Sequence, residues 1–135
     1  MRAFRIVLAG HGTLPDALLA TAELVCGPLA DVTAVDLEPD ETPDRYAEQL
    51  RAAIGHDGRP VLVLADLLGG TPYNVAAAIV RRSTRVACVA GANLAMVVEA
   101  VLATEPLSDS LIERLVEVGR RGILDTERHR ASRAS

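Results

Sequence analysis

The residue of this chain best suited to chemistry is His11, which stands between two glycines. A short apolar run, residues 4–9, precedes it, and apolar residues at helical spacing follow it over 16–25. A histidine at the point where a strand gives way to a helix has little cover from neighbouring side chains. In an open α/β sheet, ligands bind at that edge, outside the carboxyl ends of the strands. We therefore interpret His11 as a candidate nucleophile.

A carboxylate, Asp66, directly follows a second apolar run at residues 60–65. Loops that follow parallel strands all emerge at one edge of the sheet, so His11 and Asp66 are expected to share that edge. A carboxylate at one imidazole nitrogen fixes the tautomer and leaves the other nitrogen free as a nucleophile. We assign this orienting role to Asp66, which would also stabilise positive charge on the ring. Asn93, after a further strand at 85–90, is expected at the same edge and as the N-cap of the next helix.

Donors for a phosphoryl group stand shortly after Asp66. Gly69 and Gly70 let the main chain approach a ligand closely, and Thr71 begins a helix whose first-turn N–H groups lack intrahelical partners. Those amides, the positive end of the helix dipole and the Thr71 hydroxyl all favour a bound anion. The residues that flank the histidine complete the set, with Gly12 in the phosphoryl-binding group and Gly10 and Thr13 at the edge of the site. The combination predicts phosphoryl transfer through a phosphohistidine.

Each element also has a plainer explanation when it is taken alone. The glycines around His11 are consistent with a simple loop, Asp66 with a helix cap, and the Gly69–Thr71 stretch with a tight turn. The first loop is not a dinucleotide fingerprint, because Pro15 stands where the third glycine would be, and no P-loop lysine is present. No Cys or His spacing predicts a metal site, and no cofactor is expected. The coincidence of these elements at one sheet edge favours the chemical interpretation.

The elements that must position these residues alternate between strand and helix. Strands are predicted at 4–9, 32–37, 60–65 and 85–90, and helices at 16–25, 43–54, 71–82, 94–103 and 110–118. This order predicts an α/β fold with a mainly parallel four-stranded sheet and helices on both faces. A short C-terminal edge strand is expected at 121–124. Residues 1–125 are expected to form one domain, and the polar, arginine-rich stretch 126–135 is expected to be disordered.

Composition narrows the class of protein. Half of the 135 residues are hydrophobic but only 2% are aromatic, which fits an aliphatic core of buried parallel strands. The formal net charge of −4 argues against a nucleic-acid surface. No stretch predicts a signal peptide or a membrane span, so the protein is expected in the cytoplasm. The two cysteines, Cys26 and Cys88, are expected to be small buried residues in a reducing compartment.

Four stretches together resemble the enzyme IIA component of the mannose family of the bacterial phosphoenolpyruvate-dependent sugar phosphotransferase system (PTS). They are Gly10–Gly12, Leu18–Glu23, Asp66–Asn74 and Gly91–Met96. The resemblance extends over residues 4–124, nearly the whole predicted domain, and Asp66–Asn74 is its most specific part.

The resemblance implies that His11 is the phosphorylated residue, with Asp66 as its partner and Thr71 near the phosphoryl group. Phosphate would arrive from the phosphocarrier protein HPr and leave for a IIB component, expected here on a separate chain. The family also implies a homodimer in which the C-terminal strand, near 121–124, is exchanged between subunits. Contact with the membrane would be indirect, through the transporter complex.

One residue departs from the family pattern. Members commonly have Ser or Thr directly before the histidine, where this chain has Gly10, so one hydroxyl contact is lost or is replaced by Thr13. The alternatives are the related phosphotransfer subunit of dihydroxyacetone kinase, a regulatory phospho-acceptor not coupled to transport, and a small hydrolase using His11 and Asp66. The glycine-rich Asp66–Asn74 stretch favours the mannose type. Nothing in the sequence names the sugar.

Overall fold

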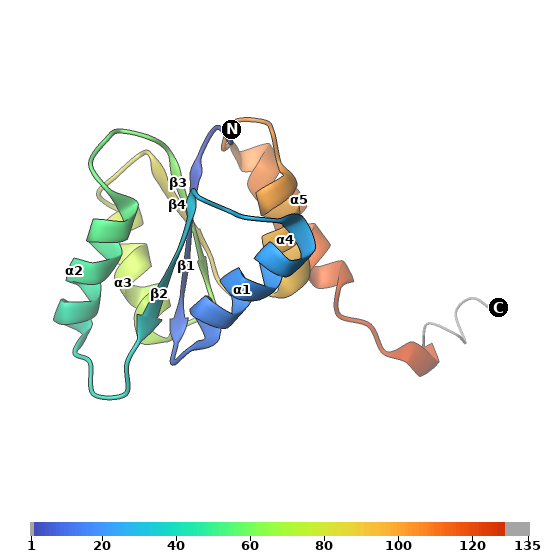
Figure 1. Ribbon diagram of the computed structural model, residues 1–135, viewed down its shortest axis with the longest axis horizontal. Helices are drawn as coiled ribbons and strands as arrows, with labels where there is room; N and C mark the ends of the chain where they lie inside the picture. Colours follow the sequence, from blue (N-terminus) through green and yellow to red (C-terminus); the bar gives the residue numbers. More distant parts are fainter. Residues whose placement is uncertain (1, 129–135) are drawn as a thin grey trace.

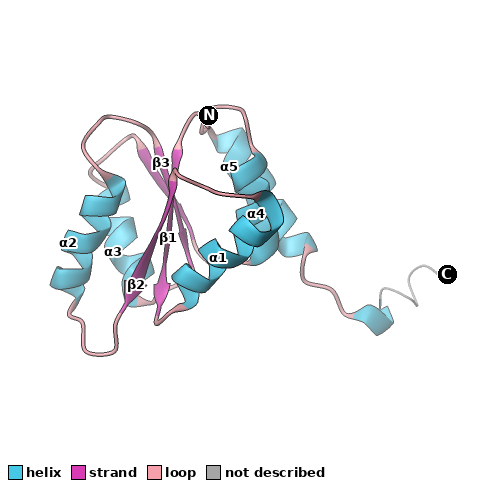
Figure 2. Ribbon diagram, viewed as in Figure 1, coloured by secondary structure: helices cyan, strands magenta, loops and turns pink. Residues whose placement is uncertain are grey.

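The computed structural model describes residues 2–128 and contains one all-parallel sheet. The sheet has the strand order β2-β1-β3-β4, and its strands, magenta in Figure 2, lie between two groups of helices. Its strands are β1 (Arg5–His11), β2 (Val32–Leu37), β3 (Val61–Ala65) and β4 (Val86–Val89). The predicted α/β class and the four parallel strands are confirmed.

Helices cover both faces of the sheet, as predicted (Figure 1). They are α1 (Leu14–Cys26), α2 (Pro43–Ile54), α3 (Thr71–Val80), α4 (Leu94–Leu102) and α5 (Asp109–Arg121). One apolar cluster joins the sheet to α1, α4 and α5, and a second joins it to α2 and α3. Neighbouring residues of β1 alternate between these clusters, Ile6 in the first and Val7 in the second, because strand side chains point to opposite faces.

The order of the strands reverses direction at one point of the sheet. From β1 the chain passes through α1 to β2 on one side, whereas β3 lies on the other side of β1 and leads into α3. The helices that follow β1 and β3 pack on opposite faces, so the loops after these two strands diverge. Ligands of open α/β sheets bind at such a switch point. His11 ends β1 and Asp66 follows β3, so both lie at this point.

Side-chain caps fix most helix starts, and one start differs from the prediction. The Thr42 hydroxyl accepts from the main-chain N–H of Arg45, at 3.2 Å, as expected for the cap of α2. The fifth helix was predicted to start at Ser110, but Ser108 caps it, with its hydroxyl 3.1 Å from the N–H of Leu111. Both serines are competent caps, and the earlier one places Asp109 in the first turn, where the helix dipole favours a carboxylate.

The predicted end of the fifth helix is also wrong, because Gly119 lies inside α5 and does not terminate it. A Cβ at Gly119 would lie 2.8 Å from Cε of Met96, so the glycine allows α5 to pack closely on α4. A sequence pattern cannot distinguish this packing role from a helix stop. The helix therefore continues to Arg121.

The C-terminal edge strand predicted for 121–124 is not formed. Arg121 is the last residue of α5, and the residues that follow have no strand to pair with in this structure. Ile123 and Leu124 are 77% and 60% exposed, and the chain here leads away from the domain (Figure 1). Residues 126–128 form a helical turn, and the remainder of the predicted tail, 129–135, lies outside the described residues. The homodimer remains a prediction.

Two expectations from composition can be compared with the described residues. Within 2–128, no helix has the length and apolar character needed to cross a membrane. Cys26 and Cys88 are both free, and both are half-buried rather than fully buried. They pack on opposite faces of the sheet, which makes a disulfide between them impossible in this fold.

Candidate functional site

His11 is the last residue of β1 and pairs with Leu37 of β2. It was predicted to lie in the loop after the strand, and that prediction is wrong. Gly12 follows with a φ of +59°, a left-handed conformation that favours glycine, and its N–H donates to the Leu37 carbonyl at 2.9 Å. The strand therefore ends abruptly at the histidine. The His11 side chain is 44% exposed, so it is accessible from solvent while its main chain is fixed in the sheet.

Asp66 holds both the ring and the main chain of His11. Its Oδ2 lies 3.0 Å from Nδ1 and accepts from the His11 main-chain N–H at 2.8 Å, while Oδ1 lies 3.2 Å from Nδ1. Asp66 is itself fixed, since its own N–H donates to the Ala9 carbonyl of β1 at 3.1 Å and its side chain is only 10% exposed. The structure thus brings the two residues together as the sequence predicted.

This pairing distinguishes the two ring nitrogens. The carboxylate accepts from Nδ1, so in the neutral imidazole the proton resides on Nδ1 and the lone pair on Nε2. Attack by Nε2 on an electrophile would place positive charge on the ring, directly beside the Asp66 carboxylate. The arrangement is suited to a nucleophile whose charged product is stabilised in place.

Gly70 packs directly against the His11 ring. A Cβ at this position would lie 2.6 Å from Cε1 and 3.2 Å from Nε2 of His11, so a side chain here would displace the ring. Gly70 is the N-cap of α3, and the first-turn amides of Thr71 and Tyr73 have no intrahelical acceptors. The N-terminus of α3 therefore lies beside Nε2, where an anion attached to that nitrogen would be stabilised.

The loop that carries these amides is held by its own hydrogen bonds. The N–H of Gly70 donates to the Leu67 carbonyl at 3.1 Å, and Nδ2 of Asn74 donates to the Gly69 carbonyl at 3.0 Å. Gly69 has a φ of +84°, which allows the chain to turn back toward the helix. Asn74, noted in the sequence only as part of a motif, fixes the loop from the first turn of α3.

The structure gives a physical reason for Gly10, the residue that departs from the family pattern. A Cβ at this position would lie 2.9 Å from both Cγ and Oδ2 of Asp66, and 3.1 Å from Cγ of Pro15. The Asp66 carboxylate cannot move freely, because it already accepts hydrogen bonds from His11. Glycine at position 10 therefore leaves room for the carboxylate in its observed place.

Two polar residues beneath and beside the site were not found from the sequence. Tyr46 of α2 is fully buried, and its hydroxyl donates to the Val35 carbonyl at 2.7 Å; burial raises its pKa. Asp36 of β2 accepts from the main-chain N–H of Asp16 at 3.2 Å, and so caps α1 from a neighbouring strand. Burial, followed by its hydrogen bond with the Asp16 side chain, raises the pKa of Asp36 to about 6. Only the packing of α1 and α2 against β2 reveals these roles.

Thr13 and Asn93, the remaining predicted site residues, have different surroundings in the structure. Thr13 precedes α1 and is exposed, but its side chain makes no capping bond. Asn93 caps α4 as predicted, accepting from the Met96 N–H at 3.0 Å, while its Nδ2 donates to the Gly119 carbonyl at 2.9 Å. Both polar ends of Asn93 are thus occupied by α4 and α5, so its side chain holds helices together. No group of potential metal ligands occurs within residues 2–128.

Most of the chain matches the model of one protein family. Residues 5–117 match the EIIA-man family model, described as the PTS system fructose IIA component. The mannose-specific EIIAB component of the PTS from Escherichia coli K12 is 34% identical over 122 residues, which are 87% of this chain and 38% of that protein. The chain thus spans 38% of the length of this relative.

Relatives of similar length were also found. The fructose-specific EIIA component of the PTS from Bacillus subtilis is 30% identical over 105 residues, which are 76% of this chain and 72% of that protein. Among solved structures, the mannose/sorbose specific IIA subunit from Enterococcus faecalis has a TM-score of 0.86 and 32% identity. That alignment covers 93% of this chain and 95% of the other.

Proposed function

Since the chain belongs to the EIIA-man family, the EIIA phosphotransfer components of mannose-family sugar phosphotransferase systems, we propose that it carries the phosphoryl group on Nε2 of His11. EIIA components of this family are phosphotransferases with a phosphohistidine intermediate. The observation that carries the assignment to His11 is the Asp66 carboxylate on Nδ1, 3.0 Å away, which leaves Nε2 as the nucleophile.

The chemical step requires a phosphorylated donor protein, which we propose to be HPr. The Nε2 lone pair attacks the phosphorus of the donor phosphohistidine, a P–N bond forms to His11, and the P–N bond to the donor breaks. The donor imidazole, protonated on its other ring nitrogen, takes the electron pair of the broken P–N bond and leaves as the neutral base. The ring of His11 gains positive charge, which Asp66 offsets at Nδ1. Nε2 then passes the group in the same manner to a IIB component.

The N-terminus of α3 supports the transferred group in this proposal. The ring lies against Gly70, and the Thr71 and Tyr73 amides, together with the Thr71 hydroxyl, supply donors on that side. Gly12 and Gly69 complete the phosphoryl-binding loops through the turns that they allow. Positioning and charge stabilisation are the main demands of phosphoryl transfer, and in this proposal the α3 N-terminus and Asp66 supply them.

The surface around His11 is suited to protein partners. Leu67 and Leu68, in the loop between Asp66 and the helix, are 58% and 70% exposed, and Leu14 at the start of α1 is 44% exposed. Leu67 and Leu68 lie in the loop between β3 and α3, and Leu14 begins the helix that follows β1, so all three are in the segments that follow the strands of His11 and Asp66. A macromolecular donor and acceptor must each bring a reactive side chain to Nε2, so we propose that these leucines contact them. We expect this exchange in the cytoplasm.

The proposal is tested by incubating the protein with phosphoenolpyruvate, enzyme I and HPr. We expect acid-labile labelling that disappears in His11→Ala. His56→Ala, which changes an exposed loop histidine far from the site, is the matched control and should label normally. Labelling that persists in His11→Ala, or that is lost equally in His56→Ala, would contradict the assignment. Transfer onward to a purified IIB component separates transport from a purely regulatory role.

A further inference from the structure

A second candidate site lies at the opposite end of the sheet from His11. A cleft of about 520 Å³ opens between the C-terminal ends of α2 and α3 and the start of β4. Its lining includes Arg51 of α2, Arg82 after α3, Arg85 before β4 and His56, and it contains no carboxylate. The volume falls in the usual range for small-molecule sites, roughly 300–1,000 Å³.

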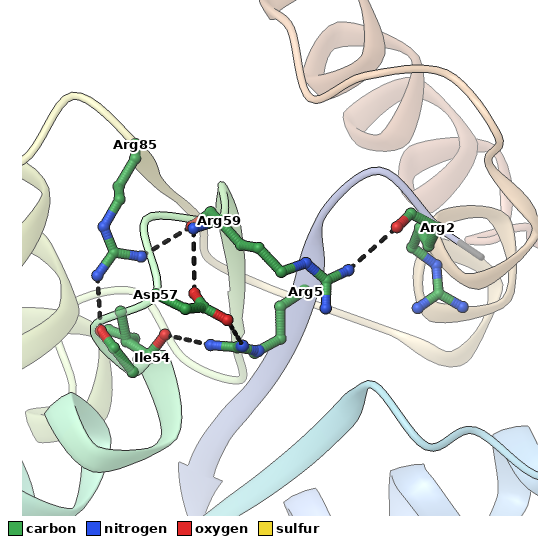
Figure 3. Close-up of polar contacts among 7 residues, drawn as sticks. Arg2, Arg5, Ile54, Asp57, Arg59 and Arg85 are labelled. Atoms are coloured by element: carbon green, nitrogen blue, oxygen red, sulfur yellow. Dashed lines mark hydrogen bonds and ion pairs between the residues drawn. The ribbon is translucent and has the colours of Figure 1, made fainter.

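Arg85 is fixed in place by main-chain oxygens. Its guanidinium donates to the Gly55 carbonyl at 2.6 Å and to the Arg59 carbonyl at 2.8 Å (Figure 3). Arg5 similarly donates to the Ile54 carbonyl at 2.6 Å. The Ile54 and Gly55 carbonyls at the end of α2 are therefore already paired with arginines.

Arg51 and Arg82 have no such partners. Within residues 2–128, neither guanidinium forms an ion pair or a side-chain hydrogen bond, whereas Arg2 and Arg5 pair with Asp31 and Asp57. Asp57 is the carboxylate nearest in sequence to the cleft, but it is occupied by Arg5 and by the N–H of Arg59 (Figure 3). Three arginines thus converge on one cleft in a chain whose formal net charge is −4.

The chemistry of the lining defines the ligand class. Guanidinium groups bind phosphate oxygens through two parallel hydrogen bonds, and several together suit a group with more than one negative charge. Apart from the arginines, His56 and Ser83, the named lining is apolar, and Ile54, Ile79 and Val86 form one wall. A ligand with a compact dianion and an uncharged body satisfies both parts.

We propose that this cleft binds a small phosphomonoester, with the phosphate on Arg51 and Arg82 and the organic body against Ile54, Ile79 and Val86. Arg85 supplies a fixed positive charge at the base, and the Ser83 side chain lies among the lining residues. The site is separate from His11, because it lies beyond the opposite end of α3. The proposal therefore does not depend on the phosphotransfer role of the histidine.

The test is an NMR titration of the ¹⁵N-labelled protein with glycerol 3-phosphate, phenyl phosphate and inorganic phosphate. We expect saturable shifts at residues 51–56 and 78–86, with both monoesters binding more tightly than inorganic phosphate. The double variant Arg51→Glu/Arg82→Glu should weaken monoester binding at least tenfold. The matched control Arg81→Glu/Arg120→Glu makes the same charge change at two exposed arginines outside the cleft and should bind as the parent does.

Three outcomes would overturn the proposal. They are shifts confined to residues 10–13 and 69–73, an absence of saturation with every probe, and an equal loss of binding in both double variants. The last result would show that overall charge, rather than this cleft, attracts the phosphate. Labelling of His11 by HPr should be unchanged in Arg51→Glu/Arg82→Glu, which separates this test from that of phosphotransfer.

Discussion

At the carboxyl end of the sheet a side-chain pair, His11 and Asp66, dominates the candidate site, whereas at the amino end Arg59 and Arg85 bind main-chain carbonyls. At the carboxyl end, Asp66 holds the His11 ring and leaves Nε2 without a partner. At the amino end, Arg85 donates to two loop carbonyls and Arg59 donates to the Arg2 carbonyl at 3.0 Å (Figure 3). The first arrangement leaves a reactive atom available, and the second joins the loops that begin the strands.

This contrast predicts that substitutions at the carboxyl end change the rate of phosphoryl transfer, whereas substitutions at the amino end change the free energy of unfolding. A change at the carboxyl end should alter phosphoryl transfer while the fold persists, because His11 and its loop are already partly solvated. A change at the amino end should lower the free energy of unfolding while transfer persists, because Arg85 donates to the Gly55 and Arg59 carbonyls, at the end of the sheet opposite His11. The following variants test this contrast in order of expected effect.

Asp66→Ala should have the largest effect, lowering the rate of phosphoryl transfer to His11 by about 100-fold, or about 2.7 kcal/mol of activation free energy. The reason is that Nδ1 loses the acceptor that sets the tautomer and stabilises the charged ring. Quench-flow transfer from phosphorylated HPr measures the rate, and circular dichroism verifies the fold. Asp40→Ala removes an exposed loop carboxylate and serves as control. Transfer at the parental rate would remove Asp66 from the proposed mechanism.

Arg85→Met should come next, lowering the free energy of unfolding by about 2 kcal/mol while HPr labels His11 at the parental rate. The substitution keeps an aliphatic stem but leaves the Gly55 and Arg59 carbonyls without their donor. Urea denaturation followed by circular dichroism measures the change. Arg120→Met, on the exposed face of α5, should alter stability little. An equal loss in both variants, or a slowed transfer in Arg85→Met, would contradict the division between the two ends.

Gly10→Ser should have the smallest effect, slowing transfer about five-fold, or about 1 kcal/mol. The added Cβ would lie 2.9 Å from Cγ and Oδ2 of Asp66, so the carboxylate must shift from its place beside Nδ1. The same labelling assay provides the rate. Gly122→Ser introduces the same side chain after α5, where the nearest atom to its Cβ is Ala95 Cβ at 3.2 Å, and should leave transfer unchanged. Faster transfer in Gly10→Ser would show that the hydroxyl outweighs the displacement.

Local chemistry explains what the sequence could predict of the fold. Thr42 and Pro43 define the start of α2 because a cap and a first-turn proline act over neighbouring residues. The continuous apolar run of β3 predicts a strand buried on both faces, and all five of its residues are buried. The shared edge of His11 and Asp66 follows from the parallel topology alone.

The features that were missed depend on tertiary contacts. The pairing with Leu37 extends β1 to His11, although the flanking glycines favour a loop. Gly119 has the appearance of a helix stop, and only the position of Met96 shows why it lies within α5. The edge strand at 121–124 was predicted from the residues themselves, and its exchange between subunits from the family resemblance. A strand cannot form without a neighbour to pair with.

Asp66 binds both the main-chain N–H and the ring Nδ1 of His11, and this has a regiochemical consequence. A half-turn flip of the imidazole would present a carbon, Cδ2, to the carboxylate in place of Nδ1, and would forfeit the bond seen at 3.0 Å. The proposed adduct is therefore a single regioisomer, substituted on the nitrogen remote from Cβ. In the proposed mechanism the fold, rather than the donor, selects that isomer, and every partner approaches along the same lone-pair direction.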